Sequence, residues 1–294
     1  CLVGPKREKQ QREAEKKMKL RLVAVDMDGT CVAGGHRVPH RNIWTLEQAW
    51  RAGVVVVPAT GRPLYGYPPS LRRLPWIRYV ISSNGARLTD RQTGRDLRQA
   101  LIPVGEAVRF LRELKGMAVW ISIHKDGICL DKNRVPFWHR RLFYPGDFAS
   151  GRRVAHLESW LAGQEGGVEK IQIFFLTKAA RRRTQALTNR CPQLVCCASH
   201  DRYVEITAAG ASKGAALRAL CEHLGIAPEE AMAIGDSDND LSMLRYAGCP
   251  VAMGNAASSI KQAASETTAD NAHCGVAWAV MKRLREECEE EKSC

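Results

Sequence analysis

The chain has 294 residues, of which 45% are hydrophobic and 26% are charged. These values are ordinary for a globular protein and leave room for two domains with their own cores. No apolar run approaches the roughly 20 residues of a membrane-spanning helix, so we expect no membrane partner. Residues 1–17 are charge-rich and lack the apolar segment of a signal peptide. We therefore expect a cytoplasmic location, with residues 1–17 as an extension outside the chemistry.

The net charge of +13 is unevenly distributed along the chain. Residues 86–207 contain 21 basic and 12 acidic side chains, whereas residues 208–294 contain 8 basic and 13 acidic ones. A basic middle segment is compatible with nucleic-acid binding, with attraction of small phosphorylated substrates, or with a solvated arginine-rich surface. Charge alone leaves these three alternatives open.

The first predicted element is the apolar, β-branched run that starts at Leu22 and ends at Asp26. Such a run predicts a buried strand, and Asp28 and Gly29 follow it closely. Residues at positions i and i+2 of a continuing strand point the same way, so Asp26 and Asp28 can face one site. Two clustered carboxylates at a buried strand end are costly unless a cation or a proton lies between them.

Strands and helices then alternate in two separate parts of the chain. We expect strands at 54–57, 79–82, 231–234 and 251–253, and helices at 42–52, 212–223, 256–264 and 275–284. The strand ends carry Thr60-Gly61-Arg62, Ser83-Asn84-Gly85 and the segment from Gly235 to Asp240. This alternation predicts an α/β core with a parallel sheet, formed by residues 18–85 and 208–294.

The segment 86–207 has a different pattern. Helices are expected at 104–114 and 178–189, and strands at 118–123, 128–130, 171–176, 194–198 and 203–206. Asp126-Gly127 lies between two of the apolar runs and indicates a hairpin. We therefore predict an α+β insert with its own sheet.

Groups that suit a metal and a phosphate gather at the predicted strand and helix ends. The carboxylates are Asp26, Asp28, Asp236 and Asp240, and the phosphate-binding candidates are Thr60 and Lys213. Oxygen ligands without His or Cys favour Mg²⁺, and the eleven cysteines lack the paired spacing of a zinc site. A hydroxyl, an ammonium and backbone N–H groups suit the remaining phosphate oxygens.

This pattern resembles the haloacid dehalogenase superfamily. The motifs that carry the resemblance appear in family order: Asp26-Met27-Asp28-Gly29-Thr30, Thr60-Gly61-Arg62, Ser212-Lys213-Gly214 and Gly235-Asp236-Ser237-Asp238-Asn239-Asp240. Asn84-Gly85-Ala86, Glu205-Ile206 and Gly275-Val276-Ala277 are similar to the Cof-type group. The resemblance covers about residues 20–285 and implies a Rossmann-like core with an α/β cap inserted at residues 86–207.

The resemblance also implies roles for individual residues. Asp26 would be the nucleophile that forms an aspartyl-phosphate, and Asp28 the acid that protonates the leaving oxygen and then activates water. Thr60, Gly61, Lys213 and Asn239 would bind the phosphate. Mg²⁺ would be held by Asp26, Asp236, Asp240 and the backbone carbonyl of Asp28. Arg62 and Asn84 are further candidates for substrate binding.

The implied function is a Mg²⁺-dependent phosphatase of small phosphorylated metabolites, such as sugar or cofactor phosphates. The alternatives are a phosphomutase that returns the phosphoryl group to a sugar, and a basic nucleic-acid-binding protein on an inert fold. We expect no specific nucleic-acid partner, and a monomer or a homodimer. Selection among esters is expected from the cap, with the candidates His124, Lys125, Arg134, His139 and Arg141.

Overall fold

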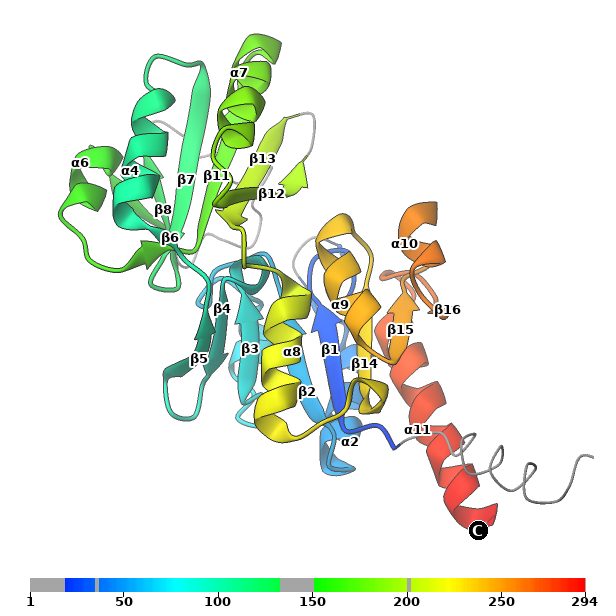
Figure 1. Ribbon diagram of the computed structural model, residues 1–294. Coiled ribbons are helices and arrows are strands. Elements are labelled where there is room, and N and C mark those ends of the chain that lie inside the picture. Colours follow the sequence, from blue (N-terminus) through cyan, green and yellow to red (C-terminus); the bar gives the residue numbers. More distant parts are fainter. Residues whose placement is uncertain (1–18, 35–36, 133–150, 200–201, 294) are drawn as a thin grey trace, which may run out of the picture.

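Two large β-sheets, each with its own covering helices, organise the chain (Figure 1). The computed structural model describes residues 19–34, 37–132, 151–199 and 202–293. The predicted extension at residues 1–17 lies outside these ranges. Among the helices within the described ranges, none combines the length and apolar character needed to cross a bilayer.

The larger sheet has eight strands in the spatial order β16-β15-β14-β1-β2-β3-β4-β5. They are β1 (Leu22–Asp26), β2 (Val55–Ala59), β3 (Tyr79–Ser82), β4 (Arg87–Asp90), β5 (Arg95–Gln99), β14 (Ala231–Gly235), β15 (Cys249–Ala252) and β16 (Glu266–Thr267). The pairs from β16 to β3 are parallel, which confirms the predicted parallel sheet. Because β1 lies between β14 and β2, its carboxyl end is central at the edge where ligands bind such sheets.

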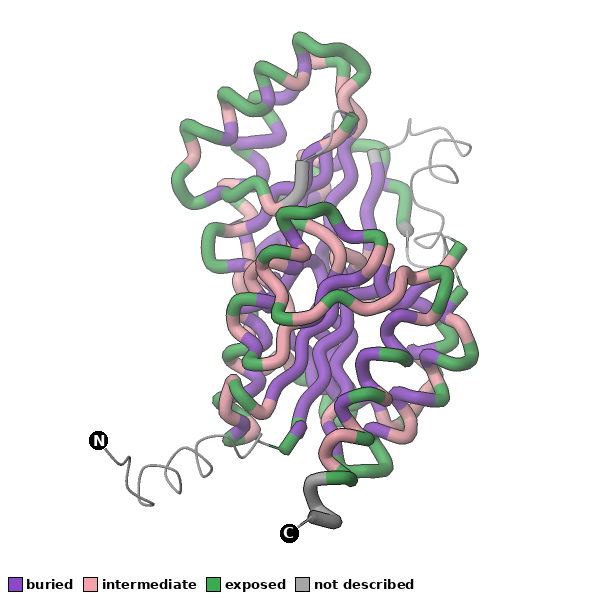
Figure 2. The backbone as a smooth tube through the Cα atoms, turned by 90° about the vertical axis from the view of Figure 1, so that its right-hand side faces the viewer, coloured by how far each residue is buried: buried purple, intermediate pink, exposed green. Residues whose placement is uncertain are grey.

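Helices cover both faces of this sheet, which explains why β1 is buried throughout and apolar from Leu22 to Val25. Val23 and Val25 pack in one cluster with residues of α2 (His40–Arg51) and α11 (Gly275–Ser293). Leu22 and Ala24 pack on the other face, with residues of α8 (Lys213–Leu224) and α9 (Leu241–Tyr246). Figure 2 shows the strands as a buried layer between more exposed helices. Short helices α3 (Pro69–Arg72) and α10 (Ser258–Gln262) and the 3-10 turns η1 (Ser83–Gly85), η3 (Pro228–Glu230) and η4 (Asp238–Asp240) complete this part.

The second sheet has six strands in the order β12-β13-β11-β7-β8-β9 and forms the predicted insert. Its strands are β7 (Val119–Lys125), β8 (Ile128–Lys132), β9 (Gly151–Val154), β11 (Lys170–Phe175), β12 (Leu194–Ser199) and β13 (Tyr203–Ala208). The helices are α4 (Val104–Glu113), α6 (Leu157–Ala162) and α7 (Lys178–Asn189), and β6 (Ile102–Pro103) pairs with β10 (Gly167–Val168). Asp126 and Gly127 both have positive φ between β7 and β8, as the predicted hairpin requires.

The two faces of the cap sheet differ in character. Ile121, Ile171 and Ile173 lie on the face that packs against residues of α4, α6 and α7. The alternate positions Ser122, Gln172 and Glu205 are paired across three adjacent strands and form the opposite, polar face. That face contacts the core, because Glu205 accepts a hydrogen bond from Asn84.

The strand pairing bears on where the cap begins. β4 and β5 pair antiparallel with β3 and extend the core sheet, although the sequence-based boundary assigned residues from 86 onward to the insert. The hairpin 87–99 is rich in charged residues, and its outer strand β5 is partly exposed at the edge of the sheet, so it has no apolar run to indicate a strand. We therefore propose a cap that begins near residue 100 and ends at residue 207.

Candidate active site

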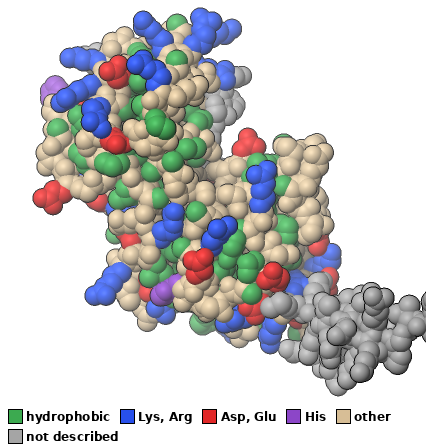
Figure 3. All heavy atoms as spheres, in the orientation of Figure 1, with side chains coloured by type: hydrophobic (Ala, Val, Ile, Leu, Met, Phe, Trp, Pro, Cys, Tyr) green, Lys and Arg blue, Asp and Glu red, His purple; other side chains and the backbone are tan. Residues whose placement is uncertain are grey.

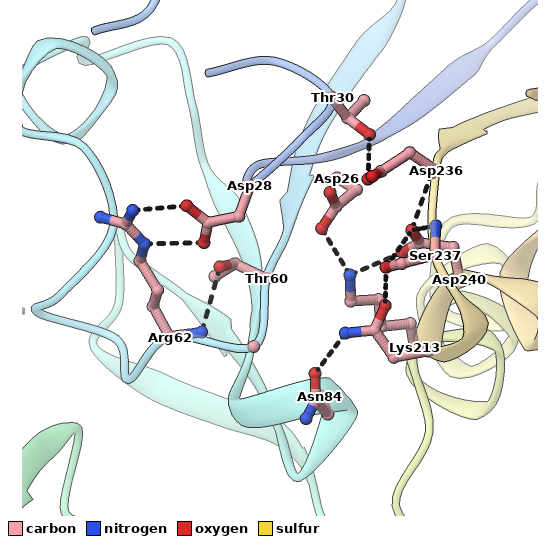
Figure 4. Close-up of polar contacts among 12 residues, drawn as sticks. Asp26, Asp28, Thr30, Thr60, Arg62, Asn84, Lys213, Asp236, Ser237 and Asp240 are labelled. Carbon is pink, nitrogen blue, oxygen red and sulfur yellow. Dashed lines mark hydrogen bonds and ion pairs between the residues drawn. The ribbon is translucent and has the colours of Figure 1, made fainter. Parts of the chain in front are cut away.

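Side chains from four elements meet at the carboxyl edge of the larger sheet (Figure 4). Asp26 ends β1, Thr60 follows β2, Lys213 opens α8, and the acidic loop with Asp236 and Asp240 follows β14. The spatial order β14-β1-β2 brings these strand ends together, although they are up to about 200 residues apart in sequence.

Lys213 links two carboxylates in the protein interior. Its Nζ donates to Asp26 Oδ1 at 2.5 Å and to Asp240 Oδ1 at 2.6 Å, and the side chain is fully buried. The Ser212 side chain accepts from the N–H of Ala215 and so fixes the start of the helix that carries Lys213. Burial lowers the pKa of Lys213, but Asp240 and Asp26 raise it more, so the lysine is charged.

Asp26, Asp236 and Asp240 form a carboxylate cluster in which one oxygen of each lies within 4.8 Å of the others. Burial and the neighbouring Asp240 raise the pKa of Asp26 well above its usual value, against the lowering effect of Lys213. Burial and Asp240 also raise the pKa of Asp236. Asp26 Oδ2 is buried without a hydrogen-bond partner. A hard divalent cation between the three carboxylates would offset this repulsion, so the donor set fits such an ion.

Hydrogen bonds from neighbouring residues hold the carboxylates of Asp236 and Asp240 in place. Asp236 Oδ1 accepts from the hydroxyl of Thr30 at 2.9 Å, and Asp240 Oδ2 accepts from the N–H groups of Asp236 and Ser237 at 3.0 Å each. Gly29 has a φ of +83°, and a Cβ there would lie 2.3 Å from Asp236 Oδ2. Only glycine combines this backbone conformation with that close approach, so Gly29 lets the two loops touch.

The side chains of Asp26 and Asp28 point in different directions, Asp26 toward Lys213 and Asp28 toward Arg62. Strand β1 ends at Asp26, so the rule that residues i and i+2 of a strand point the same way does not apply to Asp28. Figure 4 shows Asp28 facing Arg62, whose Nε and Nη2 donate to its two carboxylate oxygens at 2.8 and 2.5 Å. The Asp28 side chain is 52% exposed, whereas that of Arg62 is 10% exposed. This bidentate pair holds the Asp28 carboxylate at the open side of the site.

The remaining candidates also lie at this edge. The Thr60 hydroxyl is buried and accepts from the N–H of Arg62 at 3.1 Å, which leaves its own proton for another acceptor. Gly61 is the next residue of the chain after Thr60 and so lies in the same loop. The Asn239 amide donates to the Asn84 side-chain oxygen at 3.0 Å, so these two predicted residues contact each other.

Several residues at the site carried no predicted role. Thr30 bonds to Asp236, and three cap residues, Lys170, Gln172 and Glu205, lie behind Gly61 and Asn84. The run Lys170-Ile171-Gln172-Ile173 alternates polar and apolar residues, which is the pattern of a strand with one solvated face. Nothing in that local pattern indicates that the core covers the polar face.

The candidates for ester selection are placed only in part. His124 is buried with Nδ1 3.0 Å from the Ser83 hydroxyl, and Lys125 Nζ donates to the backbone carbonyl of Glu165 at 2.9 Å. Arg134, His139 and Arg141 lie outside the described residues.

The basic surface of the cap lies away from the acidic cluster. Exposed arginines of α4 and α7 include Arg109, Arg112, Arg182 and Arg183. These helices cover the apolar face of the cap sheet, whereas the core lies against the polar face. Figure 3 shows Lys and Arg side chains spread over the outer part of the cap, with hydrophobic and acidic side chains among them. Their charge is therefore a property of the outer surface rather than of the site.

Comparison with known proteins gives a consistent result. The family model for haloacid dehalogenase-like hydrolases matches residues 23–280. The chain is 31% identical over 286 residues to phosphatase YwpJ of Bacillus subtilis, covering 90% of this chain and 100% of that protein. It is 30% identical over 248 residues to an HMP-PP phosphatase of Serratia proteamaculans, covering 82% of this chain and 86% of that protein. A solved structure of a subclass IIB sugar phosphatase superposes with a TM-score of 0.76 at 25% identity, covering 89% of this chain and 98% of that one.

Proposed function

Because the chain belongs to the haloacid dehalogenase-like hydrolase family, as a phosphatase with a cap, we propose that it hydrolyses small phosphorylated metabolites with Mg²⁺. Sugar and cofactor phosphates are the proposed classes of ester. The named activities of the sugar phosphatase and of the HMP-PP phosphatase support these two classes. The observation that carries the proposal is the buried, unbonded Oδ2 of Asp26 beside a charged lysine.

We assign the chemical steps to residues of this site. Asp26 Oδ2 attacks phosphorus and forms an aspartyl-phosphate, while Asp28, protonated on the oxygen that leaves the Arg62 fork, gives that proton to the leaving oxygen. Asp28 then takes a proton from water, which attacks phosphorus and releases Asp26 and inorganic phosphate. The Thr60 hydroxyl, the Gly61 N–H and Lys213 bind the equatorial oxygens, and Asn239 orients the phosphate.

The metal has its own proposed ligands. Asp26, Asp236 and the backbone carbonyl of Asp28 would bind Mg²⁺ directly, and it would offset repulsion between the carboxylates and the phosphoryl group. Both oxygens of Asp240 already accept hydrogen bonds from Lys213 and from the backbone. Asp240 would therefore contact Mg²⁺ through water, and its hydrogen bond from the Asp236 N–H would hold Asp236 in position.

The direct test uses an aryl phosphate. The purified protein with Mg²⁺ should release inorganic phosphate from it, and EDTA should abolish the release until Mg²⁺ is restored. A screen of several dozen phosphorylated metabolites should then give preferred esters among sugar and cofactor phosphates. Absence of phosphate release from every ester tested would contradict the proposal, and transfer to a second hydroxyl of a sugar would indicate a mutase.

A second prediction concerns the guanidinium that holds Asp28. Arg62→Met should lower kcat by about 10- to 100-fold, because an Asp28 carboxylate without its bidentate partner is no longer held in one geometry. Arg62→Lys keeps the charge but loses the fork, so it should restore only part of the activity. Steady-state kinetics with the aryl phosphate measure both variants. Full activity of Arg62→Met would show that Asp28 needs no positioning by Arg62.

A further inference from the structure

The cap contains an ion pair that is shielded from solvent and directed at the core. Lys170 Nζ and Glu205 Oε1 are 2.9 Å apart on the neighbouring strands β11 and β13, and the two residues are 3% and 9% exposed. Burial of two charges is weak support for stability, because the lost hydration offsets most of their attraction. The contacts of this pair therefore call for an explanation beyond the packing of the cap.

Each member of the pair contacts a different loop of the core, one with the predicted phosphate-binding residue Gly61 and one with the substrate-binding candidate Asn84. Lys170 Nζ donates to the backbone carbonyl of Gly61 at 2.6 Å. Glu205 Oε2 accepts from the Asn84 amide at 2.7 Å, and Gln172 donates to Glu205 Oε1 at 2.9 Å. The Lys170 ammonium and the Glu205 carboxylate thus bind each other, and each also makes a hydrogen bond to the core.

The two loops that they contact form a single unit. The Asn84 N–H donates to the Thr60 carbonyl at 3.0 Å, and the Ser83 N–H donates to the Arg62 carbonyl at 2.8 Å. Ser83 and Asn84 have φ values of 49° and 58°, in the left-handed region that non-glycine residues seldom occupy. A Cβ at Gly61 would lie 2.8 Å from the Asn84 side-chain oxygen. A strained and closely packed turn of this kind depends on the hydrogen bonds around it.

The contacts continue from this unit to the acidic loop. Asn84 Oδ1 accepts from Asn239, and Asn239 Oδ1 accepts from the Ser237 hydroxyl at 2.8 Å. The Ser237 N–H donates in turn to Asp240. The ion pair between Lys170 and Glu205 therefore begins a series of hydrogen bonds that runs from the cap through Asn84 to the acidic loop, and Lys170 also contacts the loop that carries Gly61.

We propose that Lys170 and Glu205 are positioning residues, which hold Gly61 and Asn84 so that Thr60 and Asn239 are oriented for the phosphoryl group in the transition state. This inference rests on the proposed phosphatase function and deepens it. It means that the cap completes the phosphate site in addition to contacting the rest of the ester. Neither residue is assigned a contact with the substrate, so each acts through the loop that it holds.

The test compares two lysines of the same domain, one in contact with the core and one exposed to solvent. Lys170→Met should lower kcat for an aryl phosphate by about tenfold or more, with KM changed less than threefold, because misplacement of a phosphate ligand acts mainly on the transition state. Lys178 is an exposed lysine at the start of α7, the helix on the outer side of the cap. Lys178→Met is therefore the control, because it makes the same change in the same domain away from the core, and it should retain kcat in the folded protein.

A double variant separates positioning from stability. Lys170→Met leaves the Glu205 carboxylate buried without its cation, so its Tm should fall, and adding Glu205→Gln should restore much of that Tm. The double variant should nevertheless keep the low kcat, because the Gly61 carbonyl still lacks its donor. Recovery of kcat together with Tm would overturn the inference and leave a structural role only.

Binding of phosphate analogues gives a readout that does not require turnover. Orthovanadate, which can adopt the five-coordinate geometry of phosphoryl transfer, should bind Lys170→Met at least about tenfold more weakly than wild type, by thermal shift with Mg²⁺. Inorganic phosphate should bind both proteins within threefold. Normal kcat and vanadate affinity in Lys170→Met, beside an active wild type, would overturn this inference alone. A wild type that neither turns over esters nor binds vanadate would overturn the proposed function with it.

Discussion

Asp26→Asn should reduce phosphate release by on the order of 10⁴-fold or more while the protein stays folded. Asp26 Oδ2 is the buried, unbonded carboxylate oxygen of the site, and an amide in its place is a far weaker nucleophile. The change also removes one negative charge from a crowded cluster, so we expect no loss of Tm from repulsion. Phosphate release from an aryl phosphate with Mg²⁺ and a thermal melt measure the two effects.

Asp126→Asn is the matched control for this variant. Asp126 has a positive φ at the hairpin, a conformation that Asn adopts as readily as Asp, and its side chain is 65% exposed. The control therefore makes the same chemical change outside the site and should keep wild-type kcat. Undiminished turnover in Asp26→Asn would exclude Asp26 as the nucleophile and point to direct attack by water.

Lys213→Met should lower both stability and activity. Removal of one partner from a buried ion pair costs about 3–5 kcal/mol, because the other charge stays buried without compensation. Lys213 is the cation for both Asp26 and Asp240, so both carboxylates would lose their partner. Burial and Asp240 already raise the pKa of Asp26, and loss of the lysine would raise it further and favour the protonated, unreactive form. We expect kcat to fall by at least about 10²-fold.

Lys178→Met is the corresponding control, since Lys178 also occupies the first position of a 12-residue helix behind a side-chain N-cap. Lys178 is exposed on the cap, so its loss should change the free energy of unfolding by less than about 0.5 kcal/mol. Urea unfolding of both variants measures the difference. An equally small effect of Lys213→Met would mean that the two carboxylates are protonated in the folded protein and need no cation.

The sequence by itself determined the core elements and the residues at their ends. Strand β1 and the loops after β2, β3 and β14 follow from short apolar runs that end in Asp, Thr, Asn and Gly, because a strand buried on both faces must be apolar throughout. The alternation of strands and helices indicated a parallel sheet. In such a sheet the carboxyl ends of neighbouring strands meet at one edge, so Asp26, Thr60, Lys213, Asp236 and Asp240 could be expected together.

Only the tertiary structure decided what each side chain contacts. The ion pair between Asp28 and Arg62 depends on how the chain turns after β1 ends, and strand periodicity does not describe a turn. The hairpin 87–99 belongs to the core because its backbone pairs with β3, although its charged sequence has no strand pattern. The alternation of polar and apolar residues from Lys170 onward is typical of a strand with one solvated face, whereas Lys170 and Glu205 are buried because the core covers that face. Local pattern sets which face of a strand is polar, whereas the partner of that face is set by contacts between segments far apart in sequence.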